Sequence, residues 1–218
     1  MSKEKSRVVP GLPDEQFVRG DVPLTKEEIR CLTLSKLKLE RGNRVLDIGA
    51  GSGGLSVECA LLLGGEEVGT EKEAENETGR DNKGGEVWAL ERDPEAVALI
   101  RANLERFGLQ NVTVIEGKAP AALEGLGPFD RVIVGGSGGS LEAIIDQAFE
   151  LLVPGGVVVL NCIIIQTLTE ALAILEKHDF VKIGFIQAVI SRSRKMGGGT
   201  ALQPLNPVFI VSAVKGAS

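Results

Sequence analysis

Short apolar runs alternate with segments of helical periodicity along most of the chain. A run of β-branched and other apolar residues between glycine or polar residues predicts a buried strand, and apolar residues every three or four positions predict a helix. The predicted strands span 44–48, 86–90, 112–116, 129–134 and 155–161, and the predicted helices span 25–39, 54–63, 93–108, 140–152 and 166–178. Because strands and helices alternate, we expect a parallel sheet covered on both faces.

The end of the chain departs from this alternation. Segments 180–190 and 207–214 both have the composition of strands, but the link between them, 191–206, is rich in glycine and has no amphipathic helix. A parallel pair normally needs a crossover helix, so these two strands should pair antiparallel. The predicted fold class is therefore α/β, with about seven strands, mainly parallel and with an antiparallel final strand.

Two predicted helices carry recognisable end signals. Thr25 and Glu28 form a T-x-x-E capping box at the start of the first helix. In the helix over 93–108, Asp93 is the expected cap, with proline in the first turn and Gly108 as the stop.

Segment 64–85 does not fit the repeating pattern. It has 22 residues, of which 7 are acidic and 3 basic, with only two aliphatic side chains. Such a segment cannot bury enough apolar surface to offset the entropy lost on ordering. We expect a mobile surface insertion within a single domain that spans 1–218.

Composition narrows the class of protein. The 218 residues, 43% of them hydrophobic, suit one sizeable core, and 24 basic against 30 acidic side chains argue against a broad nucleic-acid surface. No apolar run approaches the roughly 20 residues of a membrane span, and the N-terminus lacks an apolar signal core. Three widely spaced cysteines indicate neither a disulfide framework nor a metal site. A cytoplasmic protein without a membrane or nucleic-acid partner is expected.

A glycine-rich loop, VLDIGAGSGG over 45–54, follows the first predicted strand. Its glycines satisfy the dinucleotide fingerprint G-x-G-x-x-G through Gly54, and also the tighter G-x-G-x-G through Gly53. Glycines there let a ligand approach the backbone, and the next helix offers its positive end. The loop alone therefore leaves the cofactor open.

Two further features favour S-adenosylmethionine. Glu91, at the end of the second strand, can accept hydrogen bonds from ribose hydroxyls. It lies 38 residues beyond Gly53, and 16 once the insertion is subtracted, against roughly 20 in the usual fingerprint. The reversed final strand resembles the S-adenosylmethionine-dependent methyltransferases, as does the loop, in which Asp47 precedes the first glycine by two residues. The alternatives are a solvated acid for Glu91 and, for Asp47, a carboxylate that holds the loop amides.

Four stretches together resemble one family more closely. They are LPDEQFVRGDVPLTKEEIR (12–30), VIEGKAPAAL (114–123), VIVGGSGG (132–139) and LNPVFIVSA (205–213). In this order they are similar to the CbiT family, the decarboxylating precorrin methyltransferases of cobalamin biosynthesis. The resemblance covers nearly the whole chain apart from the insertion. It implies methylation of carbon 15 of precorrin-6B, with or without cobalt, loss of carbon dioxide from the ring C acetate, and a homotetramer.

The resemblance also implies a cofactor site. By motif match, S-adenosylmethionine would contact Thr25, Asp47, Gly49, Ala50, Gly51, Ser52, Gly53, Glu91, Lys118 and Ala119. Thr25 could equally be a plain helix cap. Lys118 departs from the pattern, because an acid there could accept from the adenine amino group whereas lysine only donates.

Substrate contacts are expected from two groups of residues. The first is the second glycine cluster, with Gly135, Gly136, Ser137, Gly138 and Gly139, for which a structural turn is the alternative. The second group is cationic, because the substrate carries many carboxylates: Arg19, Arg192, Arg194 and Lys195. A solvated hairpin tip is the alternative for the last three.

No catalytic base is nominated, since methyl transfer from a sulfonium needs alignment more than proton removal. His178, the only histidine, lies at the end of a predicted helix, where a dipole interaction explains it. Three rival functions stay open: a methyltransferase for RNA or protein, a dinucleotide-dependent oxidoreductase, and a non-catalytic relative that binds the cofactor.

Overall fold

The computed structural model describes residues 9–64 and 84–217. Most of the predicted acidic insertion, 65–83, lies outside the described residues. Within the described ranges, no helix is both long and apolar enough to cross a membrane.

A seven-stranded sheet forms the centre of the molecule, in the order β3-β2-β1-β4-β5-β9-β6. The strands are β1 (Arg44–Ile48), β2 (Glu86–Glu91), β3 (Val112–Glu116), β4 (Phe129–Val134), β5 (Leu152–Cys162), β6 (Phe180–Ala188) and β9 (Val208–Lys215). Strands β1 to β5 pair parallel, whereas β9 runs antiparallel to both of its neighbours, β5 and β6. The predicted fold class, with its antiparallel final strand, is confirmed.

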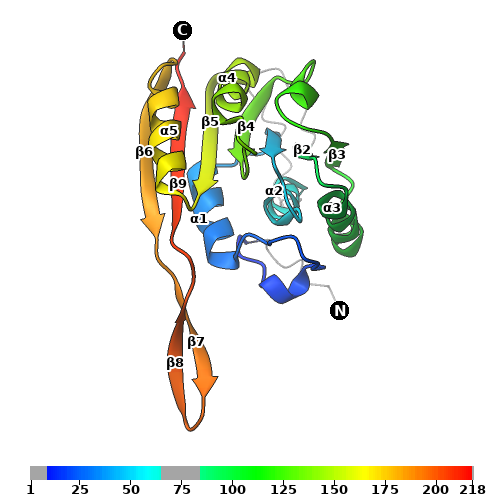
Figure 1. The fold of residues 1–218 in the computed structure, drawn as a ribbon. Coiled ribbons are helices and arrows are strands. Elements are labelled where there is room, and N and C mark those ends of the chain that lie inside the picture. Colours follow the sequence, from blue (N-terminus) through cyan, green and yellow to red (C-terminus); the bar gives the residue numbers. More distant parts are fainter. Residues whose placement is uncertain (1–8, 65–83, 218) are drawn as a thin grey trace, which may run out of the picture.

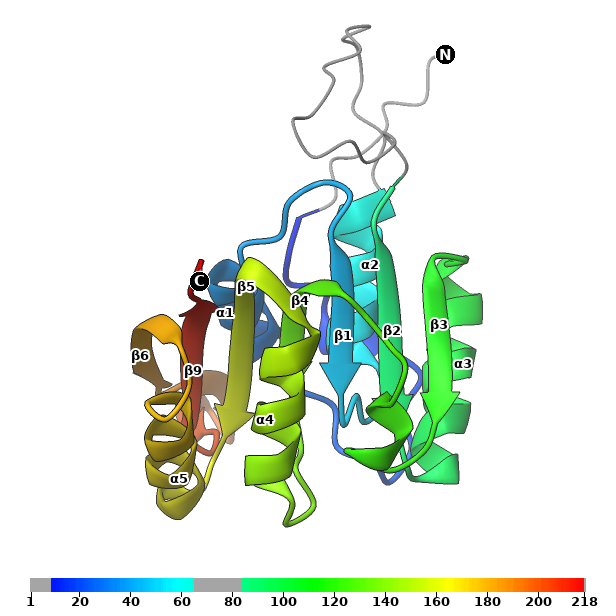
Figure 2. The same cartoon turned by 90° about the horizontal axis from the view of Figure 1, so that it is seen from above.

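Helices cover both faces of the sheet, as Figures 1 and 2 show. They are α1 (Glu27–Leu37), α2 (Gly54–Gly64), α3 (Pro94–Phe107), α4 (Leu141–Leu151) and α5 (Ile165–Leu175), with short 3-10 helices η1 (Asp14–Gln16) and η2 (Ala121–Leu123). Side chains of β1 alternate between the two faces: Leu46 and Ile48 pack with α4 and α5, whereas Val45 packs with α1 and α2. The alternation explains why the strand is apolar throughout.

The end signals of α3 are confirmed, but the predicted capping box of α1 is wrong. The Asp93 carboxylate accepts from the Glu95 amide at 3.0 Å, and Gly108 ends α3 in the left-handed conformation. The N-cap of α1 is Lys26, whose side chain makes no capping bond. Asp14, 13 residues upstream, accepts from the Glu27 amide at 3.0 Å instead.

The glycine-rich link contains two further strands, β7 (Ser191–Met196) and β8 (Gly199–Pro204). They pair antiparallel as a separate two-stranded sheet, which projects away from the body of the molecule (Figure 1). The absence of a helix in this link was predicted correctly, whereas the strands within it were not. The predicted helix over 166–178 also ends earlier, at Leu175.

Candidate cofactor and substrate cleft

The glycine loop connects β1 to α2 at the carboxyl edge of the sheet. Gly49, Gly51 and Gly53 all have positive φ, between 57° and 82°. A side chain at Gly53 would meet Ile100 of α3 at 3.1 Å, so this glycine serves packing as well as conformation. Gly54 is the first residue of α2, as predicted.

The two glycine clusters touch each other through their backbones. A Cβ atom on Gly49 would lie 2.8 Å from the carbonyl oxygen of Gly136, and one on Gly135 would lie 2.8 Å from the carbonyl oxygen of Gly49. The Gly135 amide donates to the Ile48 carbonyl at 2.9 Å. A Cβ on Gly138 would lie 2.9 Å from the guanidinium of Arg92. Close approach of protein backbone therefore accounts for Gly135, a reason that the sequence did not reveal.

Glu91 lies directly beside the glycine loop. Its Oε2 accepts from the Gly51 amide at 2.9 Å, and its Oε1 accepts from the amides of Arg92 and Asp93 at 2.8 and 3.1 Å. Because a carboxylate oxygen can accept two hydrogen bonds, Oε1 is saturated by these amides, whereas Oε2 retains capacity for a ligand hydroxyl. Glu91, Lys118 and Ala119 line a pocket of about 180 Å³.

A larger cleft, of about 780 Å³, lies on the other side of the contact between the glycine clusters. Most of its lining comes from four regions: residues 22–26, here called the strap; the glycine loop with Gly135–Ser137; the end of β5 through Ile164; and the hairpin base, defined as Ile190 and Pro204–Asn206. Gly49, Gly136 and Ser137 line both cavities, so one elongated ligand could extend along them from one cavity to the other.

The larger cleft is predominantly apolar. Among the described residues that line it, Lys26 is the only basic residue and Asp47 the only acidic one. Ile163 and Ile164, at the end of β5, line the cleft with exposures of 60% and 55%. Sequence reasoning missed Lys26, although it directly follows the nominated Thr25.

Asp47 is fully buried and accepts from the Ser56 hydroxyl at 2.6 Å. Burial raises the pKa of this carboxyl to about 6, with a further contribution from the charge of Glu91, against the hydrogen bonds of Ser56. Asp47 therefore holds Ser56 near the start of α2, rather than the loop amides, which were the alternative to a cofactor contact.

The structure brings together most of the nominated cofactor residues. Thr25, Asp47, Gly49, Ala50 and Gly51 line the larger cleft, and Glu91, Lys118 and Ala119 line the smaller pocket. Ser52 and Gly53 line neither cavity; Ser52 is buried, and its carbonyl accepts from Asn103 at 3.0 Å.

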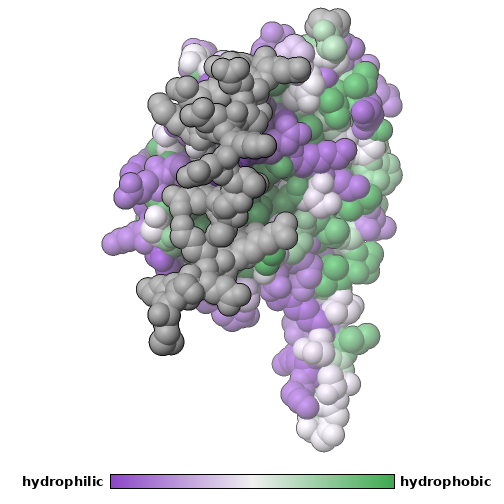
Figure 3. Space-filling model, turned by 180° about the vertical axis from the view of Figure 1, so that it is seen from behind, coloured by the Kyte–Doolittle hydropathy of each residue, from purple (hydrophilic) through white to green (hydrophobic). Residues whose placement is uncertain are grey.

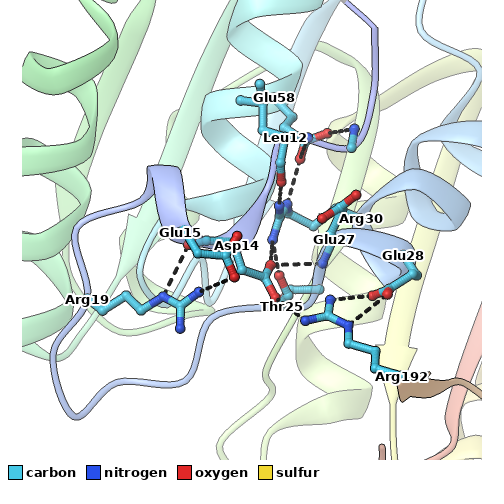
Figure 4. Close-up of polar contacts among 11 residues, drawn as sticks. Leu12, Asp14, Glu15, Arg19, Thr25, Glu27, Glu28, Arg30, Glu58 and Arg192 are labelled. Carbon is cyan, nitrogen blue, oxygen red and sulfur yellow. Dashed lines mark hydrogen bonds and ion pairs between the residues drawn. The ribbon is translucent and has the colours of Figure 1, made fainter. Parts of the chain in front are cut away.

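The four nominated substrate cations do not line either cavity. Arg19 donates to the Asp14 carbonyl at 3.1 Å and lies beside Glu15 (Figure 4). Arg192 is paired with two carboxylates, Glu28 and Asp14. Arg194 and Lys195 are exposed on β7.

A buried ion cluster, centred on Arg30, contacts the strap at the Thr25 carbonyl. Arg30 is 0% exposed, and its guanidinium pairs with Asp14 at 2.8 Å and with Glu58 at 2.6 Å (Figure 4). It also donates to the carbonyls of Thr25 and Leu12. Burial alone would raise the Asp14 pKa, but hydrogen bonds from Arg30 and Arg192 outweigh it and lower that pKa. The cluster joins the N-terminal segment to α1 and α2.

His178 lies beyond the end of α5, not at its last turn. Its Nε2 lies 2.7 Å from Asp146 of α4, and its ring stacks on Phe149. These contacts are remote from both cavities. Among residues 9–64 and 84–217, no group of three or more metal-ligating side chains occurs.

Comparison with known proteins identifies the relatives of this chain. Residues 15–215 match the precorrin methyltransferase domain. A probable cobalt-precorrin-6B C(15)-methyltransferase (decarboxylating) of Saccharolobus solfataricus is 37% identical, with 97% of this chain and 99% of the relative covered. The crystal structure of a precorrin-6y C5,15-methyltransferase from Geobacter metallireducens is 36% identical, with a TM-score of 0.81 over 96% of this chain and all of that chain.

A structure with lower sequence identity also has this fold. A SAM-dependent O-methyltransferase of Thermotoga maritima superposes with a TM-score of 0.68 at 19% identity, covering 89% of this chain and 67% of that one. The fold is thus the Rossmann-like fold of SAM-dependent methyltransferases.

Proposed function

Because the chain belongs to the precorrin methyltransferase family, we propose that it methylates carbon 15 of precorrin-6B or its cobalt form and decarboxylates the ring C acetate, with S-adenosylmethionine as methyl donor. The observation that carries this proposal is the pair of cavities on either side of Gly49 and Gly136. They offer a small site with the charged side chains of Glu91, Arg92 and Lys118 beside a much larger, mainly apolar one, at the edge of the sheet where ligands bind in this class of fold.

The residues present fit S-adenosylmethionine. Glu91 in the smaller pocket would accept from a ribose hydroxyl through Oε2, and the adenine would lie beside Ala119, with recognition by backbone because Lys118 only donates. The methionine portion would follow Gly49 and Gly51 into the larger cleft, where Asp47 is the one acidic side chain among the described lining residues. When bound, this cofactor supplies an electrophilic methyl group.

The chain's own residues would align the substrate and exclude water from the methyl group. The apolar lining at Ile163 and Ile164 suits the flat macrocycle of a tetrapyrrole, since burial of apolar surface on both sides favours contact. The reduced macrocycle is electron-rich and can accept the electron pair released with carbon dioxide. No general base is required from the protein for methyl transfer.

Lys26 would take the role expected from the sequence for Arg19, Arg192, Arg194 and Lys195. It lies in the strap, forms no ion pair within the described part of the chain, and is the one basic residue among the described residues that line the cleft. An ammonium group in partly desolvated surroundings pairs well with a carboxylate. Lys26 is thus the first candidate to hold a peripheral carboxylate of the substrate.

The direct test incubates the protein with S-adenosylmethionine and cobalt-precorrin-6B and follows the product by mass spectrometry. Gain of one methyl group together with loss of carbon dioxide is expected. A product with neither change would reject the proposal, and so would a chain that binds S-adenosylhomocysteine yet never turns over.

The rival functions are separated by two binding measurements. Calorimetry with NAD and with S-adenosylhomocysteine should show binding of the second alone; the opposite result would indicate an oxidoreductase. Tight, salt-sensitive RNA binding would instead revive an RNA methyltransferase.

The homotetramer implied by the family resemblance is part of the proposal. Figure 3 shows hydrophobic side chains gathered on the body beside the projecting hairpin. Phe185 on the edge strand β6 is 50% exposed, and Met196 and Leu202 on the hairpin are 67% and 74% exposed. Burial of these side chains between subunits would stabilise an oligomer, which light scattering would detect. The cytoplasmic location stays a prediction.

A further inference from the structure

Two walls of the larger cleft come from distant parts of the chain. One is the strap, which leads into α1, and the other is the hairpin base, which leads into β7 and β8. The hairpin is not hydrogen-bonded to the main sheet; it forms its own two-stranded sheet. A lone two-stranded hairpin has little intrinsic stability, so side-chain ties to the body help to hold its base beside the cleft.

Arg192 supplies such a tie. It lies on β7, two residues after Ile190 of the hairpin base, and it reaches Glu28, two residues after Lys26 of the strap. The contact is a two-pronged one: Nε donates to Glu28 Oε1 at 2.8 Å, and Nη2 donates to Glu28 Oε2 at 2.6 Å. The two residues are 164 positions apart in sequence.

The same guanidinium reaches the buried ion cluster. Its Nη1 donates to Asp14 Oδ2 at 3.1 Å, and the other Asp14 oxygen holds both Arg30 and the amide of Glu27 (Figure 4). The Asp14 side chain is 2% exposed, against 34% for Arg192 and for Glu28. The Arg192 charge is therefore matched by two protein carboxylates, one of which is anchored in the core.

We infer that Arg192 is a positioning residue, which fixes the hairpin base against the strap and so sets the shape of the substrate half of the cleft. This role differs from the direct carboxylate contact expected from the sequence. The smaller pocket contains no residue of the hairpin or the strap. Loss of the tie should therefore impair substrate binding much more than binding of the adenosine end of the cofactor.

This inference rests on the proposed function, and its test compares substrate and cofactor separately. Arg192→Gln and Glu28→Gln each remove the two-pronged contact while keeping polar side chains. The KM for cobalt-precorrin-6B should rise about tenfold in each, whereas the dissociation constant for S-adenosylhomocysteine should stay within about twofold. Arg192→Lys keeps the charge but not the planar guanidinium, so its KM should lie between those of wild type and Arg192→Gln.

Lys177→Gln is the matched control, because it removes another ion pair, to Glu142, at an exposed site away from both cavities. It should change neither constant. An unchanged KM in Arg192→Gln, or equal losses for substrate and cofactor in both Arg192 variants, would overturn the inference.

Hydrogen exchange keeps the two proposals distinguishable. If wild type is inactive towards cobalt-precorrin-6B, the proposed function fails, and exchange of the β7 and β8 amides still decides the tie. Faster exchange there in Arg192→Gln than in Lys177→Gln supports it, and identical exchange rejects it.

Discussion

The buried carboxyl of Asp47 allows its effect on the free energy of unfolding to be predicted in sign and size. Its carboxyl is 1% exposed, and burial, with the neighbouring charge of Glu91, raises its pKa to about 6 from an ordinary value of 3.8. Asp47→Asn removes the charge but keeps an oxygen that can accept from the Ser56 hydroxyl. The variant should therefore be more stable than wild type at neutral pH.

The sign and size of this stability difference follow from how many protons the Asp47 carboxyl binds in the folded and unfolded states. Below pH 3.8 the carboxyl is protonated both folded and unfolded, so it adds no pH dependence. Between pH 3.8 and about 6 the unfolded chain releases a proton that the folded chain keeps, so wild-type stability falls as pH rises. Above about pH 6 the loss is complete. A pKa difference of about two units corresponds to about 3 kcal/mol.

Urea unfolding of wild type and Asp47→Asn at a series of pH values from 4 to 8, at one protein concentration, measures this difference. The free energy of unfolding of the variant, relative to wild type, should increase by up to about 3 kcal/mol across the range and level off above pH 6 to 7. Asp21→Asn, at an exposed position, is the control. A difference that is flat with pH, or that grows in favour of wild type, would refute the reasoning.

Three further substitutions test other parts of the site. Gly49→Ala should weaken S-adenosylhomocysteine binding at least tenfold by calorimetry, because its Cβ would meet backbone at 2.8 Å; Gly125→Ala, with a similar positive φ but open space, should not. Lys26→Gln should raise the KM for cobalt-precorrin-6B about tenfold in steady-state assays, whereas Lys36→Gln, in the last turn of α1 and outside both cavities, should leave it unchanged. Arg30→Met should lower the free energy of unfolding by about 3–5 kcal/mol in urea, since it leaves the buried Glu58 carboxylate without its cation and removes one of the two cations that pair with Asp14.

The fold was largely predictable because its signals are local. Each strand of the main sheet and each long helix was recognisable from its own segment, and the end signals at Asp93 and Gly108 directly flank α3. Even the antiparallel final strand followed from a local observation, the lack of a helix in 191–206. The capping of α1 could not be predicted in this way, because Asp14 reaches it from a separate segment. The local T-x-x-E pattern was misleading for the same reason, since Glu28 is engaged by Arg192.

The candidate site was predictable only where residue type and chain position suffice. Glu91 at a strand end and the glycines after β1 lie where the topology requires. Exposed side chains of the strap and the hairpin can point into the cleft or away from it. No sequence periodicity shows which way they point, so the cations that line the cleft could not be predicted. The carboxylates of the expected substrate led to Arg19, Arg192, Arg194 and Lys195 as candidates, whereas the structure places Lys26 in the cleft and pairs Arg192 with carboxylates.

The strong ion pairs of this region lie outside the cleft, and the cleft lining has few charged side chains. Arg30 and Arg192 pair with three carboxylates, Asp14, Glu58 and Glu28, outside the cleft, where they support its walls. The cleft itself keeps few charged residues. A cationic methyl donor would be repelled by a cleft lined with arginines, and a carboxylate-rich substrate would be repelled by one lined with acids. Confining the strong ion pairs to the supporting structure allows one cleft to admit both.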